Sequence, residues 1–151
     1  IYPISFTQYI FGQPPEIVFG NQWIGETGVD ETFAGQMIYS NGSMAQISAS
    51  FRTPLHMFIE IIGTKGRLYI PHPFAGMEKK PKMKHYAEDE KPQTIRIPHK
   101  ELYLGEVEDM HAAILDGKPN LIKLKETRDH IRTALALLQS AQTGEPAQLE
   151  A

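Results

Sequence analysis

The sequence predicts an α+β fold: an open, mostly antiparallel β-sheet of about six strands with helices packed on one face. Three observations lead to this prediction. Strand-like segments follow one another between residues 16 and 97 with no helix-like segment among them. Two of these segments are joined by Asn41-Gly42, a pair typical of tight hairpins. The helix-like segments stand apart, one before this block and two after it, as in α+β folds.

Length and composition indicate one globular domain covering residues 1–151. Hydrophobic residues make up 41% of the chain and charged residues 22%, which is close to average globular usage and argues against disorder. A net charge of -3 gives no electrostatic reason to expect nucleic acid or an anionic membrane as a partner. The chain has no Cys, no apolar run of membrane-spanning length and no signal-like segment, so we expect a cytoplasmic protein.

The first element is predicted to be a short helix that begins near Pro3, a residue that suits a first helical turn. Ile4, Phe6, Tyr9 and Ile10 follow at mostly helical spacing, and Gly12 then ends the pattern. Residues 16–24 (EIVFGNQWI) read as a strand.

The sharpest local signal is the hairpin in ETFAGQMIYSNGSMAQISASFR, residues 31–52. Asn41-Gly42 favours positive φ at both positions, which predicts a two-residue type I′ turn. This turn would place the following residues opposite each other: Ser40 and Ser43, Ile38 and Ala45, Gln36 and Ile47, Ala34 and Ala49, Thr32 and Phe51.

The predicted register assigns a role to each face of the hairpin. The face formed by those pairs is small and apolar, so we expect it to pack against helices. The opposite face is half apolar and half polar, and such a face is either solvated or meets another chain. Its candidate interface residues are Phe33, Met37, Tyr39 and Met44.

The segment LHMFIEIIGTKGRLYI, residues 55–70, predicts a further hairpin with its turn at residues 63–66. Its first strand carries apolar side chains on both faces, which predicts a central position in the sheet. Residues 71–92 are rich in Pro, Lys and Glu and read as an excursion with an edge strand near 82–87. Residues 93–97 form one more candidate strand.

Two amphipathic helices are predicted at the end of the chain. The first, in EVEDMHAAILDGKPN (residues 106–120), carries apolar residues at i, i+3, i+4, i+7 and i+8 from Val107 and has acidic residues in its first turn. The second, in KETRDHIRTALALLQSAQTGEP (residues 125–146), has an apolar stripe that includes Leu135 and Leu138 and ends at Gly144.

The residues alone support little chemistry. The six His residues are scattered without ligand spacing, so no metal site is predicted. No glycine-rich phosphate-binding motif follows a strand and opens a helix, so no cofactor is expected in this chain. Tyr2 stands at a helix start, where a phenol can be positioned to donate a proton to a substrate oxygen, although on composition alone packing is the more common role. No substrate-binding residues can be named.

Four segments in order resemble the C-terminal domain of the Gfo/Idh/MocA oxidoreductase family. VDETFAGQMIYSNGSMAQISASF is similar to the family's acidic strand and N-G hairpin, and IEIIGTKGRLYI to its E-I-x-G-T-x-G hairpin. EVEDMHAAILDGKP resembles its E-x-x-D-F-x-x-A-I-x-x-G-x-x-P helix, and TALALLQSAQTGEPAQL its closing helix and tail. The likeness is greatest to the branch of dihydrodiol dehydrogenase and glucose-fructose oxidoreductase, and weakest over residues 71–100.

The resemblance implies that this chain is the substrate and dimerisation domain of a two-domain enzyme. An N-terminal Rossmann domain outside this chain would hold NAD or NADP, and the substrate would be a sugar, a polyol or a related alcohol or carbonyl compound. Tyr2 matches the family's tyrosine that acts as general acid and base beside a lysine of the Rossmann domain. The chain would associate into a dimer or higher oligomer through its open sheet face, and the fragment by itself would be inactive.

Two other interpretations remain open from the sequence. The chain could be a non-catalytic dimerisation module of the same fold, in which the sheet face with Met37 pairs two subunits. It could also be a stand-alone ligand-binding domain, which would need a closed apolar cavity between sheet and helices.

Overall fold

The computed structural model describes residues 1–74, 81–88 and 90–149. They contain three helices and eight strands, and the strands form two four-stranded antiparallel sheets. The predicted α+β class with antiparallel strands is confirmed, although the strands are more numerous than the six expected. The chain divides into two compact units, here named unit 1 (Ile1–Pro54 with Ile122–Ala151) and unit 2 (Leu55–Leu121).

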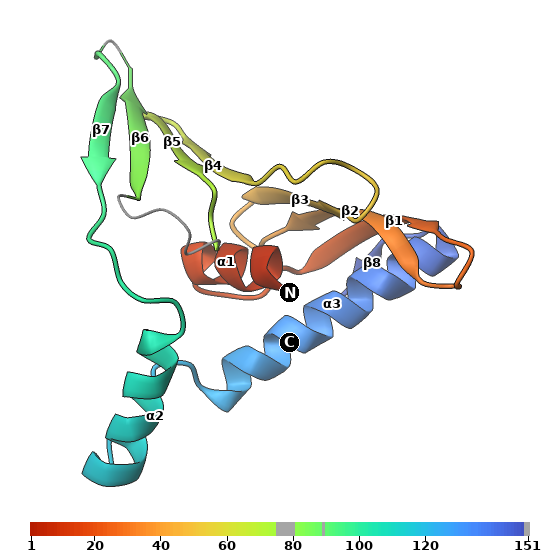
Figure 1. Cartoon of the computed structure of the whole chain (residues 1–151). Coiled ribbons are helices and arrows are strands. Elements are labelled where there is room, and N and C mark those ends of the chain that lie inside the picture. The colour runs from red at the N-terminus through yellow and green to blue at the C-terminus, as the bar shows by residue number, and fades with distance from the viewer. Residues whose placement is uncertain (75–80, 89, 150–151) are drawn as a thin grey trace. The chain divides into compact units, whose positions relative to one another are not determined.

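Unit 1 is a four-stranded sheet with two helices on one face (Figure 1). Its elements are α1 (Tyr2–Phe11), β1 (Ile17–Ile24), β2 (Asp30–Ile38), β3 (Met44–Ser50), α3 (Leu124–Thr143) and β8 (Ala147–Gln148). The strands lie in the order β3-β2-β1-β8. α3 packs against β1, and α1 contacts both α3 and the sheet. The first helix ends at Gly12, whose φ of 69° is the left-handed conformation that glycine adopts most readily.

The β2–β3 hairpin corrects the predicted register by one residue. The structure pairs Met37 with Ala45 and Ile38 with Met44, whereas a two-residue turn would have paired Ile38 with Ala45. The turn has three residues between Tyr39 and Ser43, because the Gly42 backbone N–H donates to the Tyr39 carbonyl and Gly42 adopts a φ of 79°. This is the three-residue loop with a left-handed glycine, the other common way in which an Asn-Gly pair closes a hairpin.

The shifted register reverses the predicted faces of β2, while β3 keeps its predicted side, since Ala45 and Ile47 pack against the core as expected. Met37 and Tyr39 are 0% and 1% exposed, and they form the core of unit 1 with Ile4, Val18 and Leu137. The four predicted interface residues therefore do not form one exposed face. Met37 and Tyr39 are buried, and Phe33 packs against the core. Of that set, only Met44, at 63% exposed, lies on the outer face.

Two glycines allow α3 to approach the sheet closely. Gly20 of β1 and Gly35 of β2 are paired neighbours, and Leu137 lies directly over both of them. The Gly20 backbone N–H also donates a hydrogen bond of 3.0 Å to the Ser140 hydroxyl of α3. A side chain at Gly20 would occupy the space of the Leu137 carbonyl, so glycine is required for this contact.

Unit 2 contains the second sheet and one helix. Its elements are β4 (Phe58–Gly63), β5 (Gly66–Pro71), β6 (Lys82–Ala87), β7 (Gln93–Arg96) and α2 (Leu104–Asp116). The strand order is β4-β5-β6-β7, so β4 is an edge strand and its predicted central position is wrong. Apolar side chains on both faces do not by themselves determine strand order. The strand predicted at 82–87 is confirmed as β6, but its predicted edge position is wrong, because β6 pairs with both β5 and β7. Residues 75–80 and 89 of the Pro-rich segment lie outside the described residues.

None of the helices in the described parts of the chain is long and apolar enough to cross a membrane.

Candidate active site

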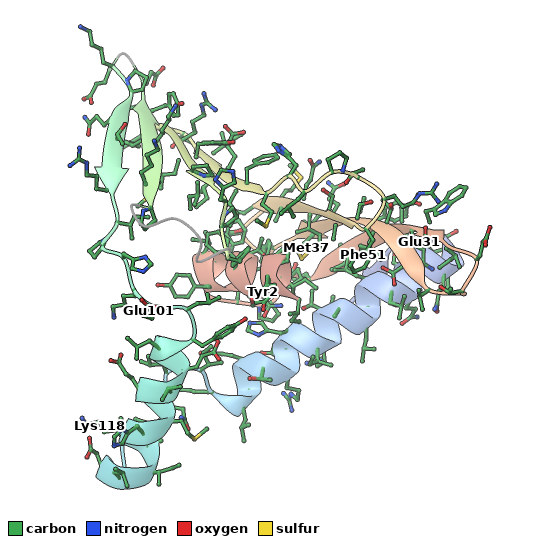
Figure 2. The ribbon with its side chains drawn as sticks, in the orientation of Figure 1. Tyr2, Glu31, Met37, Phe51, Glu101 and Lys118 are labelled. Carbon is green, nitrogen blue, oxygen red and sulfur yellow. The ribbon has the colours of Figure 1, made fainter. Side chains whose placement is uncertain are left out.

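Tyr2 is the first residue of α1, and its side chain is 57% exposed (Figure 2). Pro3 follows it within the first turn, where a missing backbone N–H costs no helical hydrogen bond. The N-cap residue Ile1 makes no side-chain hydrogen bond to the helix, and the first turn carries no acidic residue. No side-chain cap therefore holds the start of this helix, and buried contacts farther along it contribute to its position.

α1 is anchored through one buried face. Ile4 and Gln8 are each 6% exposed and lie one helical turn apart. Ile4 belongs to the core of unit 1. Gln8 Nε2 donates a 2.7 Å hydrogen bond to Thr133 Oγ1 of α3 and lies 3.5 Å from the Asp129 carbonyl oxygen. Phe11, the last residue of α1, also packs against this core. The exposed tyrosine thus belongs to a helix that is held by apolar contacts at Ile4 and Phe11 and by a polar contact at Gln8.

The α3 turn beneath this anchor carries a buried carboxylate. The Asp129 side chain is 6% exposed, and its Oδ2 accepts a 2.7 Å bond from Lys125 Nζ. Arg132 Nη1 lies 3.8 Å from Oδ1. The hydrogen bond from Lys125 holds the pKa of Asp129 below its ordinary value of 3.8, against the opposing effect of burial. The ion pairs therefore stabilise the charged form of Asp129 and stiffen this turn of α3.

This lowered pKa predicts an acid-dependent loss of stability. A carboxyl group whose folded pKa lies below its unfolded value stabilises the protein fully above the unfolded value, and this contribution is lost as the pH falls through the folded value. We expect Asp129→Asn to lower the free energy of unfolding by about 1 kcal/mol near neutral pH, since Lys125 is largely exposed and screened. The difference between variant and wild type should shrink at about pH 3.

Urea unfolding monitored through the single tryptophan, Trp23 of β1, measures this difference in unit 1. The exposed pair of Lys118 and Asp116, 3.1 Å apart in unit 2, offers a control, because Asp116→Asn should change the Trp23 transition very little. If the difference in unfolding free energy between Asp129→Asn and wild type did not change with pH, the lowered pKa of Asp129 would be contradicted.

A cavity of ≈ 450 Å³ lies in unit 1 beside the loop that follows α1. Its lining includes Gln13, Glu16 and Ser40 together with Asp129 and Arg132 of α3, so it is partly charged. Tyr2 is not among the lining residues, and the structure does not bring the predicted catalytic residue and this cavity together. The cavity also lacks the closed apolar character that a stand-alone ligand-binding domain would need.

The described part of the chain has no glycine-rich turn of the Rossmann type between a strand and the start of a helix. A pyrophosphate site of the Rossmann type needs a glycine-rich turn between a strand and the start of a helix. Here Gly12, Gly117 and Gly144 each follow the end of a helix, and Gly42 and Gly66 lie in or beside hairpin turns. Within the described ranges no group of three or more His, Cys, Asp or Glu residues is placed to hold a metal ion.

Sequence reasoning missed the polar anchor of Gln8, Thr133 and Asp129. Gln8 and Thr133 lie 125 positions apart in sequence, and neither residue belongs to a recognisable motif. The available signal was a glutamine one turn after Ile4, on the side of α1 that the apolar spacing marks as buried.

The family model for the C-terminal alpha/beta domain of an oxidoreductase family matches residues 1–149. The chain belongs to the Gfo/Idh/MocA oxidoreductase family. The predicted family, and the role of the chain as the C-terminal domain, are thereby confirmed.

Characterised Gfo/Idh/MocA relatives include sugar and diol dehydrogenases. D-xylose 1-dehydrogenase (NADP(+)) 2 of Haloferax volcanii is 26% identical over 149 residues, which are 99% of this chain and 46% of that protein. The trans-1,2-dihydrobenzene-1,2-diol dehydrogenase of Xenopus laevis is 37% identical over 71 residues, which are 46% of this chain and 22% of that protein. The chain thus spans less than half the length of these relatives.

Solved structures of other oxidoreductases share the fold. The aldose-aldose oxidoreductase of Caulobacter crescentus, solved in complex with glycerol, superposes with a TM-score of 0.87 over 98% of this chain and 45% of its own, at 16% identity. UDP-N-acetylglucosamine 3-dehydrogenase of Acidithiobacillus ferrooxidans gives a TM-score of 0.79 at 18% identity, over 93% of this chain and 44% of its own. At these identities the likeness establishes the fold.

Proposed function

We propose that this chain is the substrate-side domain of an NAD(P)-dependent oxidoreductase that acts on a sugar, a polyol or a related alcohol or carbonyl compound. The observation that carries the proposal is the match of 99% of the chain to an NADP(+)-dependent D-xylose dehydrogenase, together with the match to the family's C-terminal domain. A hydroxyl or carbonyl group on a small polar carbon skeleton is the substrate chemistry that such relatives have in common.

In this proposal Tyr2 transfers the proton to and from the substrate oxygen. Its phenol donates a proton to the substrate oxygen when a carbonyl is reduced, and the phenolate accepts the alcohol proton in the reverse direction. The nicotinamide nucleotide, bound outside this chain, supplies the hydride chemistry. Two features support this role for Tyr2: its side chain is exposed, and the helix that carries it is fixed by buried contacts at Ile4 and Gln8.

The test is an assay of the complete gene product with NAD⁺ and NADP⁺ against a panel of aldoses and polyols. Nucleotide-dependent oxidation of at least one of these compounds is expected. The 151-residue chain alone, titrated calorimetrically with NADH and NADPH, should bind neither, because its described part has no loop that fits a pyrophosphate. Absence of both turnover and nucleotide binding in the complete protein would refute the proposal, and micromolar binding by the isolated chain would refute the assignment of the nucleotide to another domain.

The outer face of the unit 1 sheet supports a role in oligomerisation, the non-catalytic alternative. With the register corrected, this face carries Phe19, Trp23 and Met44, which are 40%, 58% and 63% exposed, among small and polar neighbours such as Ala34 and Gln46. Both helices of unit 1 contact the opposite face. A half-apolar sheet face can pair with its own copy across a two-fold axis, so a second copy of this chain is the proposed partner.

If the outer face pairs two copies, Met44→Glu should give a monomer on sizing chromatography with light scattering, because a buried carboxylate would lack a partner there. Gln142 is an exposed residue of α3, on the other side of the sheet. Gln142→Glu adds the same charge there and should leave the dimer intact. A dimer that survives Met44→Glu, or a monomeric wild type, would exclude this surface as the interface. Met37→Glu is unsuitable for this test, since Met37 is buried in the core.

A further inference from the structure

We propose that Gln8 and Thr133 act as a positioning pair that sets the orientation of Tyr2, an inference that rests on the proposed function. The pair joins α1 to α3 through one short hydrogen bond, 2.7 Å from Gln8 Nε2 to Thr133 Oγ1. Gln8 is 6% exposed and Thr133 is 0% exposed, so water does not compete for this bond. The helix that carries Tyr2 therefore has a directional buried contact as well as its apolar contacts at Ile4 and Phe11.

The direction of the hydrogen bond is fixed by a second one. Thr133 Oγ1 donates to the Asp129 carbonyl oxygen at 2.8 Å, so its hydrogen is committed within α3. Thr133 Oγ1 can then only accept a hydrogen bond from α1, so Gln8 must present its amide nitrogen as the donor. Asp129 in turn is held by Lys125 and Arg132, which stiffen the turn of α3 on which the pair rests.

A buried polar residue costs desolvation free energy, which its hydrogen bond only offsets. An apolar side chain of similar length would bury the same surface without the need for a partner. What the amide adds is direction, because the apolar contacts of α1 at Ile4 and Phe11 tolerate small rotations and shifts of the helix, whereas a hydrogen bond tolerates little of either motion. The start of α1 has no side-chain cap that could fix it instead.

The pair lies close enough to Tyr2 to control its position. Gln8 is six positions after Tyr2 along α1, which is about 9 Å of helix. A tilt of about 10° about Gln8 would move the start of the helix by about 1.5 Å, and a displacement of about 1 Å can cost a reaction about 100-fold. A loss of this bond should therefore appear in catalysis even where the fold survives.

The test uses the complete protein and two variants that keep packing while removing the bond: Thr133→Val, which is isosteric, and Gln8→Met, which retains side-chain length. Each should lower kcat by about 10- to 100-fold with little change in KM. Thr133→Ser keeps the hydroxyl and should restore kcat to within about 3-fold of wild type. The matched control is Thr143→Val, because Thr143 makes the same intrahelical bond, to the Gln139 carbonyl at 3.1 Å, and is exposed.

A double-mutant cycle with Tyr2→Phe separates positioning from general stability. If the pair acts through Tyr2, Thr133→Val should cause little further loss of kcat once Tyr2 is replaced. Losses that multiply in the double variant, or folded Thr133→Val and Gln8→Met proteins with wild-type kcat, would overturn the inference. In the second case an inactive Tyr2→Phe enzyme would leave the proposed role of Tyr2 standing, whereas a fully active Tyr2→Phe enzyme would refute that role and the positioning pair together.

Discussion

Replacing Tyr2 by Phe in the complete protein is expected to lower kcat by about 10²- to 10⁴-fold, with KM changing much less. The substitution removes one hydroxyl and leaves the ring, so the start of α1 keeps its shape. The loss should be large because the substrate oxygen changes its protonation state during oxidation or reduction, and water transfers this proton poorly in a closed active site.

Tyr9→Phe is the matched control for this substitution. Tyr9 lies on the same helix, is 82% exposed and loses the same hydroxyl group, so its kcat should remain at the wild-type value. The assay is steady-state turnover with the nucleotide and substrate identified in the substrate panel. Retention of activity within a few-fold in Tyr2→Phe would show that another group moves the proton.

Gly20→Ala is expected to lower the free energy of unfolding of unit 1 by about 3 kcal/mol or more. A Cβ at this position would lie within 3.0 Å of the Leu137 carbonyl oxygen, a backbone atom that cannot rotate away. α3 cannot retreat without weakening the 3.0 Å hydrogen bond from the Gly20 N–H to Ser140 and exposing Leu137, which is 1% exposed. Either response destabilises the protein.

Substitutions at two other glycines serve as comparisons for Gly20→Ala. All three are measured by urea unfolding followed through the fluorescence of Trp23. Gly35→Ala should cost less, because its Cβ would meet the Leu137 side-chain methyl at 2.9 Å, and a side chain can shift. Gly105→Ala lies in α2 with no atom within 4 Å and should leave the Trp23 transition unchanged. A cost below about 1 kcal/mol for Gly20→Ala would contradict the close approach of α3 to the sheet.

Much of the fold could be predicted because its signals are local. Gly12 and Gly144 marked helix ends correctly, since a left-handed residue after the last turn is a property of a few consecutive residues. The apolar periodicity after Pro3 likewise predicted α1. The two-residue β8 was missed, because it pairs with residues of β1 that lie 129 and 131 positions earlier in the chain.

The hairpin shows the limit of local reasoning most clearly. Asn41-Gly42 correctly predicted a tight turn, but the same pair fits both a two-residue and a three-residue loop. The choice between them moves the register by one residue and turns Met37 and Tyr39 from the outer face to the core. That choice depends on which side chains fill the space beneath α3, and this space does not exist until the helix and the sheet have come together.

The sequence by itself determined the family, the α+β class, the order of the elements and the candidate proton donor Tyr2. Only the tertiary structure decided which sheet face is buried, why Gly20 must lack a side chain and which partner Gln8 finds on α3. The physical reason is one of range: propensity, capping and periodicity act over a few residues, whereas packing and buried hydrogen bonds join residues more than a hundred positions apart.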